Sequence, residues 1–221
     1  MKRSKLYAAA GSALLLSSAA FTASLSGGTA VAAGEQTARA GSAETRTFFT
    51  ALNNSGVRGM AEVDVNHRHL DIDVDARGLL KGMPHAQHIH FGEQAANECP
   101  TVDLAGKDHR LNTAEGVPAY GPIAVSLTTR GPTGPGSGLA VTRFPTADNG
   151  KIHYDRQTRT KRAVARAIRN GEGVVVIHGI DYNNNGKYDF RGAGKSELDP
   201  NLPAEATDPV ACGVLRVKSK D

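Results

Sequence analysis

The sequence carries almost no net charge once its first residues are set aside. Three of its 26 lysines and arginines (Lys2, Arg3 and Lys5) fall within the first 33 residues, which hold none of the 22 aspartates and glutamates. The rest of the chain therefore has 23 basic residues against 22 acidic ones. Without an excess of positive charge, the composition gives no reason to expect binding to nucleic acid.

The one long apolar run lies at the N-terminus, from about Leu6 to Leu25, and a small-residue stretch ends at Ala33. Basic residues followed by such a run are typical of a signal peptide, so we expect residues 1–33 to be cleaved and the protein to be secreted or extracytoplasmic. No membrane span would then remain. The alternative is an uncleaved anchor, although Ser17, Ser18, Thr22 and Ser24 dilute the run. Residues 34–45 are small, polar and aperiodic, which indicates a disordered leader, and residues 46–221 suffice for one domain.

Cysteine is scarce, with only Cys99 and Cys212 in the chain. In an exported protein two cysteines indicate one disulfide, with two free buried thiols as the alternative. The bridge would close a loop of over a hundred residues. For such a loop a chain-entropy model gives about 4 to 5 kcal/mol of stabilisation.

Helical patterns are also scarce, whereas short β-prone segments separated by glycine and proline turns are frequent. We expect one helix, in which Thr160 caps residues 161–169. These patterns predict an all-β antiparallel sandwich or barrel with one short helix. The strands that we expect lie at residues 47–53, 60–65, 70–75, 88–90, 123–129, 139–144, 151–155, 173–178 and 212–217.

The segment with the most evident chemistry is Pro84–Cys99, where His85, His88 and His90 fall within six residues. In an extended strand His88 and His90 project from the same face, whereas His85 would lie on the other. Neutral imidazole is the commonest protein ligand for copper and zinc. The pair therefore predicts half of a metal site, which needs partners from elsewhere in the fold.

Three further histidines carry weaker signals. His67 and His69 form a second pair in the turn between two expected strands, where we expect a solvated hairpin tip. His178 ends an apolar strand and precedes Gly179, so it could reach a site at the rim of a sheet. A lone histidine there is more often a hydrogen-bonded structural residue.

A different metal signal follows His178, where Asp181, Asn183, Asn185, Gly186 and Asp189 give the pattern DxNxNGxxD. Oxygen side chains at alternate positions and a glycine at the turn suit calcium. The twelfth position lacks the usual glutamate. A solvated turn is therefore the alternative interpretation.

Several motifs together resemble the copper/zinc superoxide dismutase family. They are HisIleHis followed by PheGly, a cysteine nine positions after His90, ValValIleHisGly and a late AlaCysGlyVal. The part from Phe48 through ArgGlyLeu to HisIleHis also resembles the chordin-type (CHRD) domain. The resemblance implies an eight-stranded Greek-key β-sandwich with metal ligands on long loops.

Carried over residue by residue, the resemblance implies that His88, His90 and His178 are copper ligands. Cys99 and Cys212 match the family's disulfide. His109 is the candidate for the remaining copper ligand, with a surface-loop histidine as the alternative. Residues 110–121 lack the further histidines and aspartate of the zinc loop, so we do not expect zinc. AspProVal (208–210) stands where the family has its active-site arginine, and without that guanidinium the attraction of a small anion should weaken.

The sequence therefore predicts an exported, copper-only superoxide dismutase-like protein whose small-anion substrate, if it is active, is superoxide. The reaction implied by the resemblance converts superoxide to oxygen and hydrogen peroxide. The rival is a non-catalytic extracellular domain of the chordin type that binds metal or a partner without turnover. The missing arginine and zinc ligands favour the rival, whereas the retained order of histidines and cysteines favours the enzyme.

Overall fold

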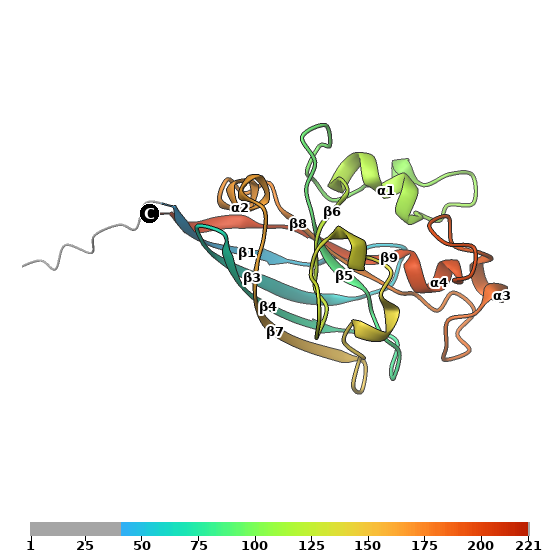
Figure 1. Cartoon of the computed structure of the whole chain (residues 1–221). Helices are drawn as coiled ribbons and strands as arrows, with labels where there is room; N and C mark the ends of the chain where they lie inside the picture. The colour runs from blue at the N-terminus through green and yellow to red at the C-terminus, as the bar shows by residue number, and fades with distance from the viewer. Residues whose placement is uncertain (1–40, 221) are drawn as a thin grey trace, which may run out of the picture. The chain divides into compact units, whose positions relative to one another are not determined.

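The computed structural model describes residues 41–220, which form two five-stranded antiparallel sheets packed face to face (Figure 1). These residues lie in one compact unit. The expected signal peptide and most of the expected leader lie outside the described residues. The prediction of an all-β sandwich is confirmed. No helix within residues 41–220 is long and apolar enough to cross a membrane.

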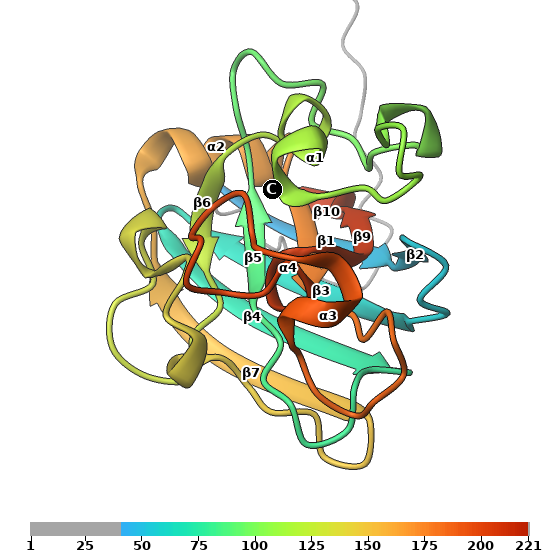
Figure 2. The ribbon, with the colours of Figure 1, turned by 90° about the vertical axis from the view of Figure 1, so that its right-hand side faces the viewer.

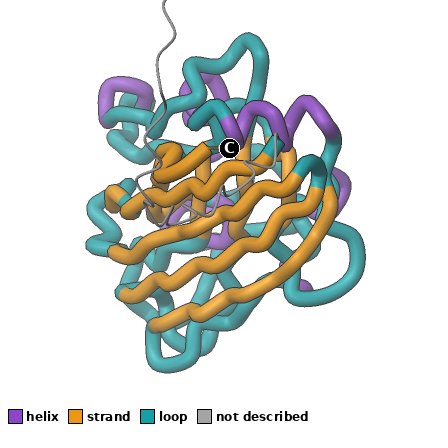
Figure 3. Tube along the Cα trace, turned by 90° about the vertical axis from the view of Figure 1, so that its left-hand side faces the viewer, coloured by secondary structure: helices purple, strands orange, loops and turns teal. Residues whose placement is uncertain are grey.

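Sheet 1 is built from the longer strands in the order β10-β1-β3-β4-β7, and Figure 3 shows its strands side by side. Alternation of apolar and polar residues places one side chain in two against sheet 2 and leaves the other facing outward. The predicted hairpin of two alternating strands is confirmed, with His67 at its tip. The strands are β1 (Ser42–Phe48), β3 (Arg58–Asn66), β4 (His69–Arg77), β7 (Lys151–Arg159) and β10 (Arg216–Lys220).

Sheet 2 has the order β2-β9-β8-β5-β6, and both of its faces are covered. Its inner face joins the main core with sheet 1 through residues such as Ile89, Val175 and Ile177. Its outer face carries a second cluster that includes Val174, Val176 and Cys212. The strands are β2 (Thr50–Ala51), β5 (Gln87–His90), β6 (Ile123–Ser126), β8 (Val174–His178) and β9 (Pro209–Val214).

Short helices and long loops cover the outer face of sheet 2, and Figure 2 shows α1, α3 and α4 gathered on that side. The prediction of a single helix is therefore wrong. The helices are α1 (Thr113–Tyr120), α2 (Arg162–Arg169), α3 (Phe190–Ala193) and α4 (Ala204–Thr207), with single 3₁₀ turns at Val102–Leu104, Pro135–Ser137 and Val141–Arg143.

Several expected boundaries differ from the structure. β1 begins at Ser42, so the last residues of the expected leader pair with β3 and β10. The strand expected at 139–144 is a 3₁₀ turn followed by Phe144, which is buried. The strand expected at 212–217 is divided between β9 and β10. Lys161, rather than Thr160, is the N-cap of α2, and it offers no side-chain cap.

Candidate metal centre

Three histidines meet on the outer face of sheet 2. His88 and His90 project from the same face of β5, as the two-residue period predicts. In the neighbouring strand β8, Val176 lies opposite His88 and Val174 opposite His90, and His178 continues the same row at the end of the strand. The structure thus brings His178 to the pair, and one ring nitrogen from each histidine lies within 4.8 Å of the other two.

Each of the three imidazoles uses one ring nitrogen in a hydrogen bond to a backbone carbonyl. His88 Nε2 donates to Gly138 O at 3.1 Å, His90 Nδ1 to Gly121 O at 2.8 Å and His178 Nδ1 to Thr207 O at 2.6 Å. The other nitrogens, His88 Nδ1, His90 Nε2 and His178 Nε2, have no hydrogen-bond partner among the described residues although they are buried. A bond from one nitrogen to a carbonyl fixes the tautomer, so the second nitrogen presents its lone pair. The arrangement is that of three ligands ready for one metal ion.

Burial keeps these imidazoles neutral. Their exposed fractions are 3% for His88, 1% for His90 and 2% for His178. Loss of hydration lowers the pKa of His90 to about 3 and that of His178 to about 4, and it lowers the pKa of His88 well below its usual value. Neighbouring imidazoles lower these pKa values further. All three side chains are therefore unprotonated at neutral pH, which is the form that binds metals.

Two aromatic rings pack against the histidines. The Phe144 ring meets His88 edge-on at 5.2 Å between centroids, and the Tyr120 ring lies 4.5 Å from His90. The Tyr120 hydroxyl donates to Thr113 O at 2.8 Å, so both ends of α1 are connected beside the cluster. These contacts separate the histidines from solvent in the described chain.

A buried histidine and a glycine support the backbone of His178. His85 Nδ1 donates to His178 O at 2.8 Å, and its ring meets Tyr188 edge-on at 5.9 Å. Gly179 has φ +106°, and a Cβ there would lie 2.2 Å from the Tyr188 hydroxyl. Glycine at this position is therefore required by close packing as well as by the backbone. His85 acts on the backbone of the cluster and is not one of its ligands.

The disulfide secures the loop that carries Gly121. Cys99 and Cys212 are bonded, with 5.6 Å between their Cα atoms, which confirms the predicted bridge. Cys99 lies in the long loop after β5 and Cys212 lies in β9, so the bridge ties this loop to the sheet beneath the histidines. α1 follows in the same loop and ends at Gly121, whose carbonyl holds His90.

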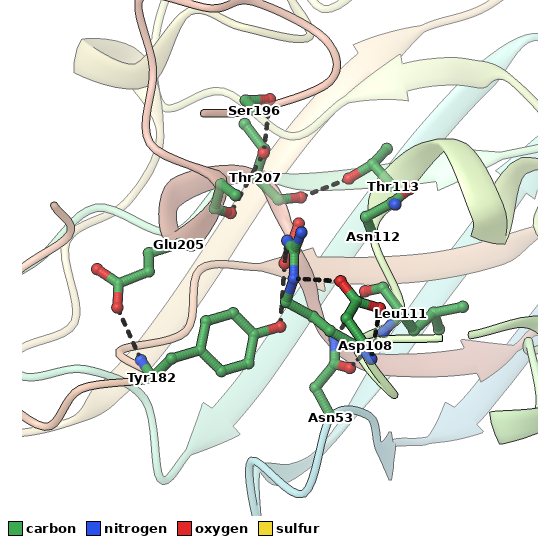
Figure 4. Close-up of polar contacts among 12 residues, drawn as sticks. Asn53, Asp108, Leu111, Asn112, Thr113, Tyr182, Ser196, Glu205 and Thr207 are labelled. Atoms are coloured by element: carbon green, nitrogen blue, oxygen red, sulfur yellow. Dashed lines mark hydrogen bonds and ion pairs between the residues drawn. The ribbon is translucent and has the colours of Figure 1, made fainter. Parts of the chain in front are cut away.

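A polar network adjoins the cluster, and Figure 4 shows part of it. The buried Asp208 accepts from Arg110 Nη1 at 2.6 Å and from the Tyr182 hydroxyl at 3.0 Å. Burial raises the pKa of Asp208 to about 6, although Arg110 and Tyr182 act to lower it. Its neighbour Thr207 accepts from both His178 and the Thr113 hydroxyl through one carbonyl. The network therefore fixes the position of the Thr207 carbonyl, which orients the imidazole of His178.

Arg110 was not apparent from the sequence. It lies beside the segment that stands in place of the family's active-site arginine, but its guanidinium is engaged by carboxylates. Besides Asp208, it contacts Asp108 at 3.3 Å and Glu197 at 3.5 Å. No motif pointed to this pairing, because the residues are about 100 positions apart in the sequence.

The structure does not bring His109 into the cluster. This residue is exposed in a turn with φ +55°, where its backbone amide donates to Gly106 O at 3.0 Å. His67 and His69 are also exposed, at the tip of the hairpin formed by β3 and β4.

The segment predicted to bind calcium forms a tight loop. Asp181 accepts from the backbone amides of Asn185 and Gly186 at 3.1 and 2.7 Å. Asn183 and Asn185 each donate a side-chain amide to the carboxylate of Asp189. Calcium binding by this loop stays a prediction, since the same contacts suit a solvated turn.

A second group of potential ligands lies on the outer face of sheet 1. It comprises Asp73, Asp75 and His153, with His153 Nδ1 3.0 Å from Asp75 Oδ1. These side chains are half-buried or exposed, and the contact between His153 and Asp75 is adequately described as a surface ion pair. The carboxylate of Asp75 raises the pKa of His153 by hydrogen bonding.

Comparison with known proteins does not assign this chain to a family. The sequence matches no protein-family model. A search of curated proteins found no significant match.

Proposed function

We propose that this chain is an exported copper-binding protein in which His88, His90 and His178 hold one copper ion. Two observations together carry the proposal: each of the three histidines places a ring nitrogen within 4.8 Å of the other two, and each has one buried ring nitrogen without a hydrogen-bond partner. A buried polar atom left without a partner is costly. Three such atoms at one place are accounted for if a metal ion occupies the space between them.

Copper suits this donor set better than the hard cations do. Imidazole nitrogen favours copper, zinc, iron and nickel, whereas calcium and magnesium prefer oxygen ligands. Among divalent first-row ions copper binds a given nitrogen site most tightly. The order of the three histidines and two cysteines, which resembles that of copper/zinc superoxide dismutases, also favours copper. Bound copper would supply one-electron redox chemistry.

The residues around the histidines favour copper binding without catalytic turnover. Exposed fractions of 3% or less leave little access for a small anion to any of the histidines. The nearby Arg110 pairs with carboxylates and offers a weak attraction to a substrate anion. Superoxide dismutation remains the second candidate, because the resemblance in motif order supports it. We also propose that the sandwich has the superoxide dismutase-like topology and is related to chordin-type domains.

Titration of the metal-free protein with copper tests the proposal. We expect one tightly bound copper per chain, and loss of this site in His88→Ala and in His178→Ala. His67→Ala and His109→Ala are matched controls, because both remove an exposed histidine and should leave the stoichiometry unchanged. Tight binding that survives both cluster substitutions would contradict the proposal.

Turnover requires a separate measurement. Superoxide decay is followed with the copper-loaded protein and with the His88→Ala variant at the same copper concentration, each with a chelator in excess over any unbound copper. Equal rates would establish binding without catalysis. A rate at least about a hundredfold higher in the unaltered protein, worth roughly 3 kcal/mol in the barrier, would establish the enzyme.

A further inference from the structure

Basic residues are concentrated in one segment of this otherwise nearly neutral chain. From Arg156 to Arg169 there are six arginines and lysines and no aspartate or glutamate. The segment covers the end of β7 and all of α2. On α2 the buried residues Val164, Ala165, Ala167 and Ile168 face the core, so Arg162 and Arg166 are exposed to solvent.

The hairpin of β3 and β4 adds a further arginine to this surface. Arg68 Nε donates to Thr160 O at 2.9 Å, and Arg169 Nη1 donates to His67 O at 2.9 Å. The hairpin tip therefore lies against both ends of α2. We call this surface the α2 basic patch and define it as Arg68, Lys161, Arg162, Arg166 and Arg169. Arg159 is not part of it, because strand alternation places its side chain with Asp155 on the outer face of sheet 1.

The five cations of the α2 basic patch form no ion pair with an acidic side chain among residues 41–220, unlike Arg46 or Arg110. Lys161 and Arg162 also lie at the N-terminus of α2, whose first turn contains no acidic residue. Positive charges at that end oppose the helix dipole, and Arg162 and Arg166 repel each other at a spacing of four residues. Arg68 and Arg169 serve the fold through their hydrogen bonds to Thr160 O and His67 O. Lys161 and Arg162 are instead placed where the helix disfavours positive charge, which indicates that they interact with something outside the chain.

The chemistry of the patch suits a linear polyanion. Arginine binds sulfate, carboxylate and phosphate groups through paired hydrogen bonds. Arg166 lies about 6 Å along the helix axis from Arg162, and Arg169 about 4.5 Å further, so the charges follow one line. Glu62, Asp73 and Asp155 lie side by side on sheet 1, whose outer face would repel the same polymer.

Two classes of polyanion fit less well. Single-stranded nucleic acid is usually held by aromatic side chains that stack on bases, and the segment from Arg156 to Arg169 contains none. A membrane-surface helix needs an exposed apolar face, whereas that of α2 is buried. We propose that the α2 basic patch binds an anionic polysaccharide carrying sulfate or carboxylate groups. This inference does not depend on the metal site.

Heparin, a sulfated and carboxylated polysaccharide, is the probe for the test. Its affinity for the full chain is measured by calorimetry over a range of salt concentrations, for the unaltered protein and for Arg162→Gln/Arg166→Gln. We expect the double variant to bind about tenfold more weakly near 0.15 M salt, with a shallower dependence on salt. The matched control is Arg58→Gln/Arg77→Gln, which removes two exposed arginines at the other end of the same hairpin and should change affinity less than twofold.

A second variant, Arg68→Gln/Lys161→Gln, removes two patch charges outside the helix and should weaken binding similarly. Unchanged affinity in both patch variants, or no heparin binding by the unaltered chain, would overturn the proposal. Duplex DNA and vesicles of anionic phospholipid are measured in parallel. Binding of either that is as tight as heparin binding, and is lost with the same arginines, would overturn the assignment to a polysaccharide.

Discussion

Acidification should destabilise the metal-free protein through its buried histidines. Relative to an unfolded pKa near 6.5, the folded pKa is lowered to about 3 for His90 and about 4 for His178. As the pH falls below 6.5, the unfolded chain takes up protons that the folded chain does not. The stability contributed by neutral burial is thus complete above pH 6.5 and is lost as the pH falls toward the folded pKa values.

The expected loss is large compared with the stability of a typical domain. Each histidine contributes about 1.4 kcal/mol per pH unit, so at pH 5 the two together remove about 4 kcal/mol. The pKa of His88 is shifted in the same direction and adds to this loss. Since domains are commonly stable by about 5 to 15 kcal/mol, metal-free protein should approach unfolding between about pH 4 and 5.

The assay is urea unfolding at pH 7 and pH 5 in the presence of chelator. In His90→Phe, which keeps an aromatic ring beside Tyr120, the difference in unfolding free energy between the two pH values should shrink by about 2 kcal/mol. His69→Gln is the control, because this histidine is exposed at the hairpin and the difference should persist. If His90→Phe shows the same pH dependence as the unaltered protein, His90 is not a neutral buried imidazole and the reasoning fails.

Three further predictions concern the surroundings of the cluster. Replacing Cys99 and Cys212 with alanine should lower the free energy of unfolding by about 4 kcal/mol in denaturant titrations. The copper affinity should also fall, because the loop that leads to Gly121 is released. An equal affinity would show that the loop holds its position without the bridge. Asp208→Ala should lower the free energy of unfolding by about 3 kcal/mol, because Arg110 loses its buried partner. The same substitution should speed the release of copper to a chelator. An unchanged release rate would exclude a connection between Asp208 and His178. If the 181–189 loop binds calcium, millimolar calcium should raise the melting temperature, and Asp181→Ala should abolish that rise; a melting temperature indifferent to calcium and chelator leaves the solvated turn.

Strand periodicity was sufficient to predict part of the candidate site. Alternation placed His88 and His90 on one face, and the structure agrees. The role of His178 came from a resemblance in motif order, because residues that meet from separate strands share no local pattern. The three carbonyl partners could not be predicted, since Gly121, Gly138 and Thr207 come from three different connections.

Two errors in the predicted elements have identifiable causes. α1 was missed although its start is marked in the sequence: Asn112 and Glu115 form a reciprocal capping box, a signal that precedes many helices. The segment 139–144 was expected to be a strand but forms a 3₁₀ turn instead. Phe144 instead packs against His88, and Arg143 bonds to Pro132 O and to the hydroxyl of Ser137 in the same loop. Tertiary contacts therefore decide the conformation of this segment.

Locating copper in crystals by anomalous scattering at the copper edge tests the central claim most directly. The account predicts one strong peak within about 2 Å of His88 Nδ1, His90 Nε2 and His178 Nε2, the range of metal to imidazole bonds. A copper peak found only at the surface group of Asp73, Asp75 and His153, with no density between the three buried histidines, would contradict it.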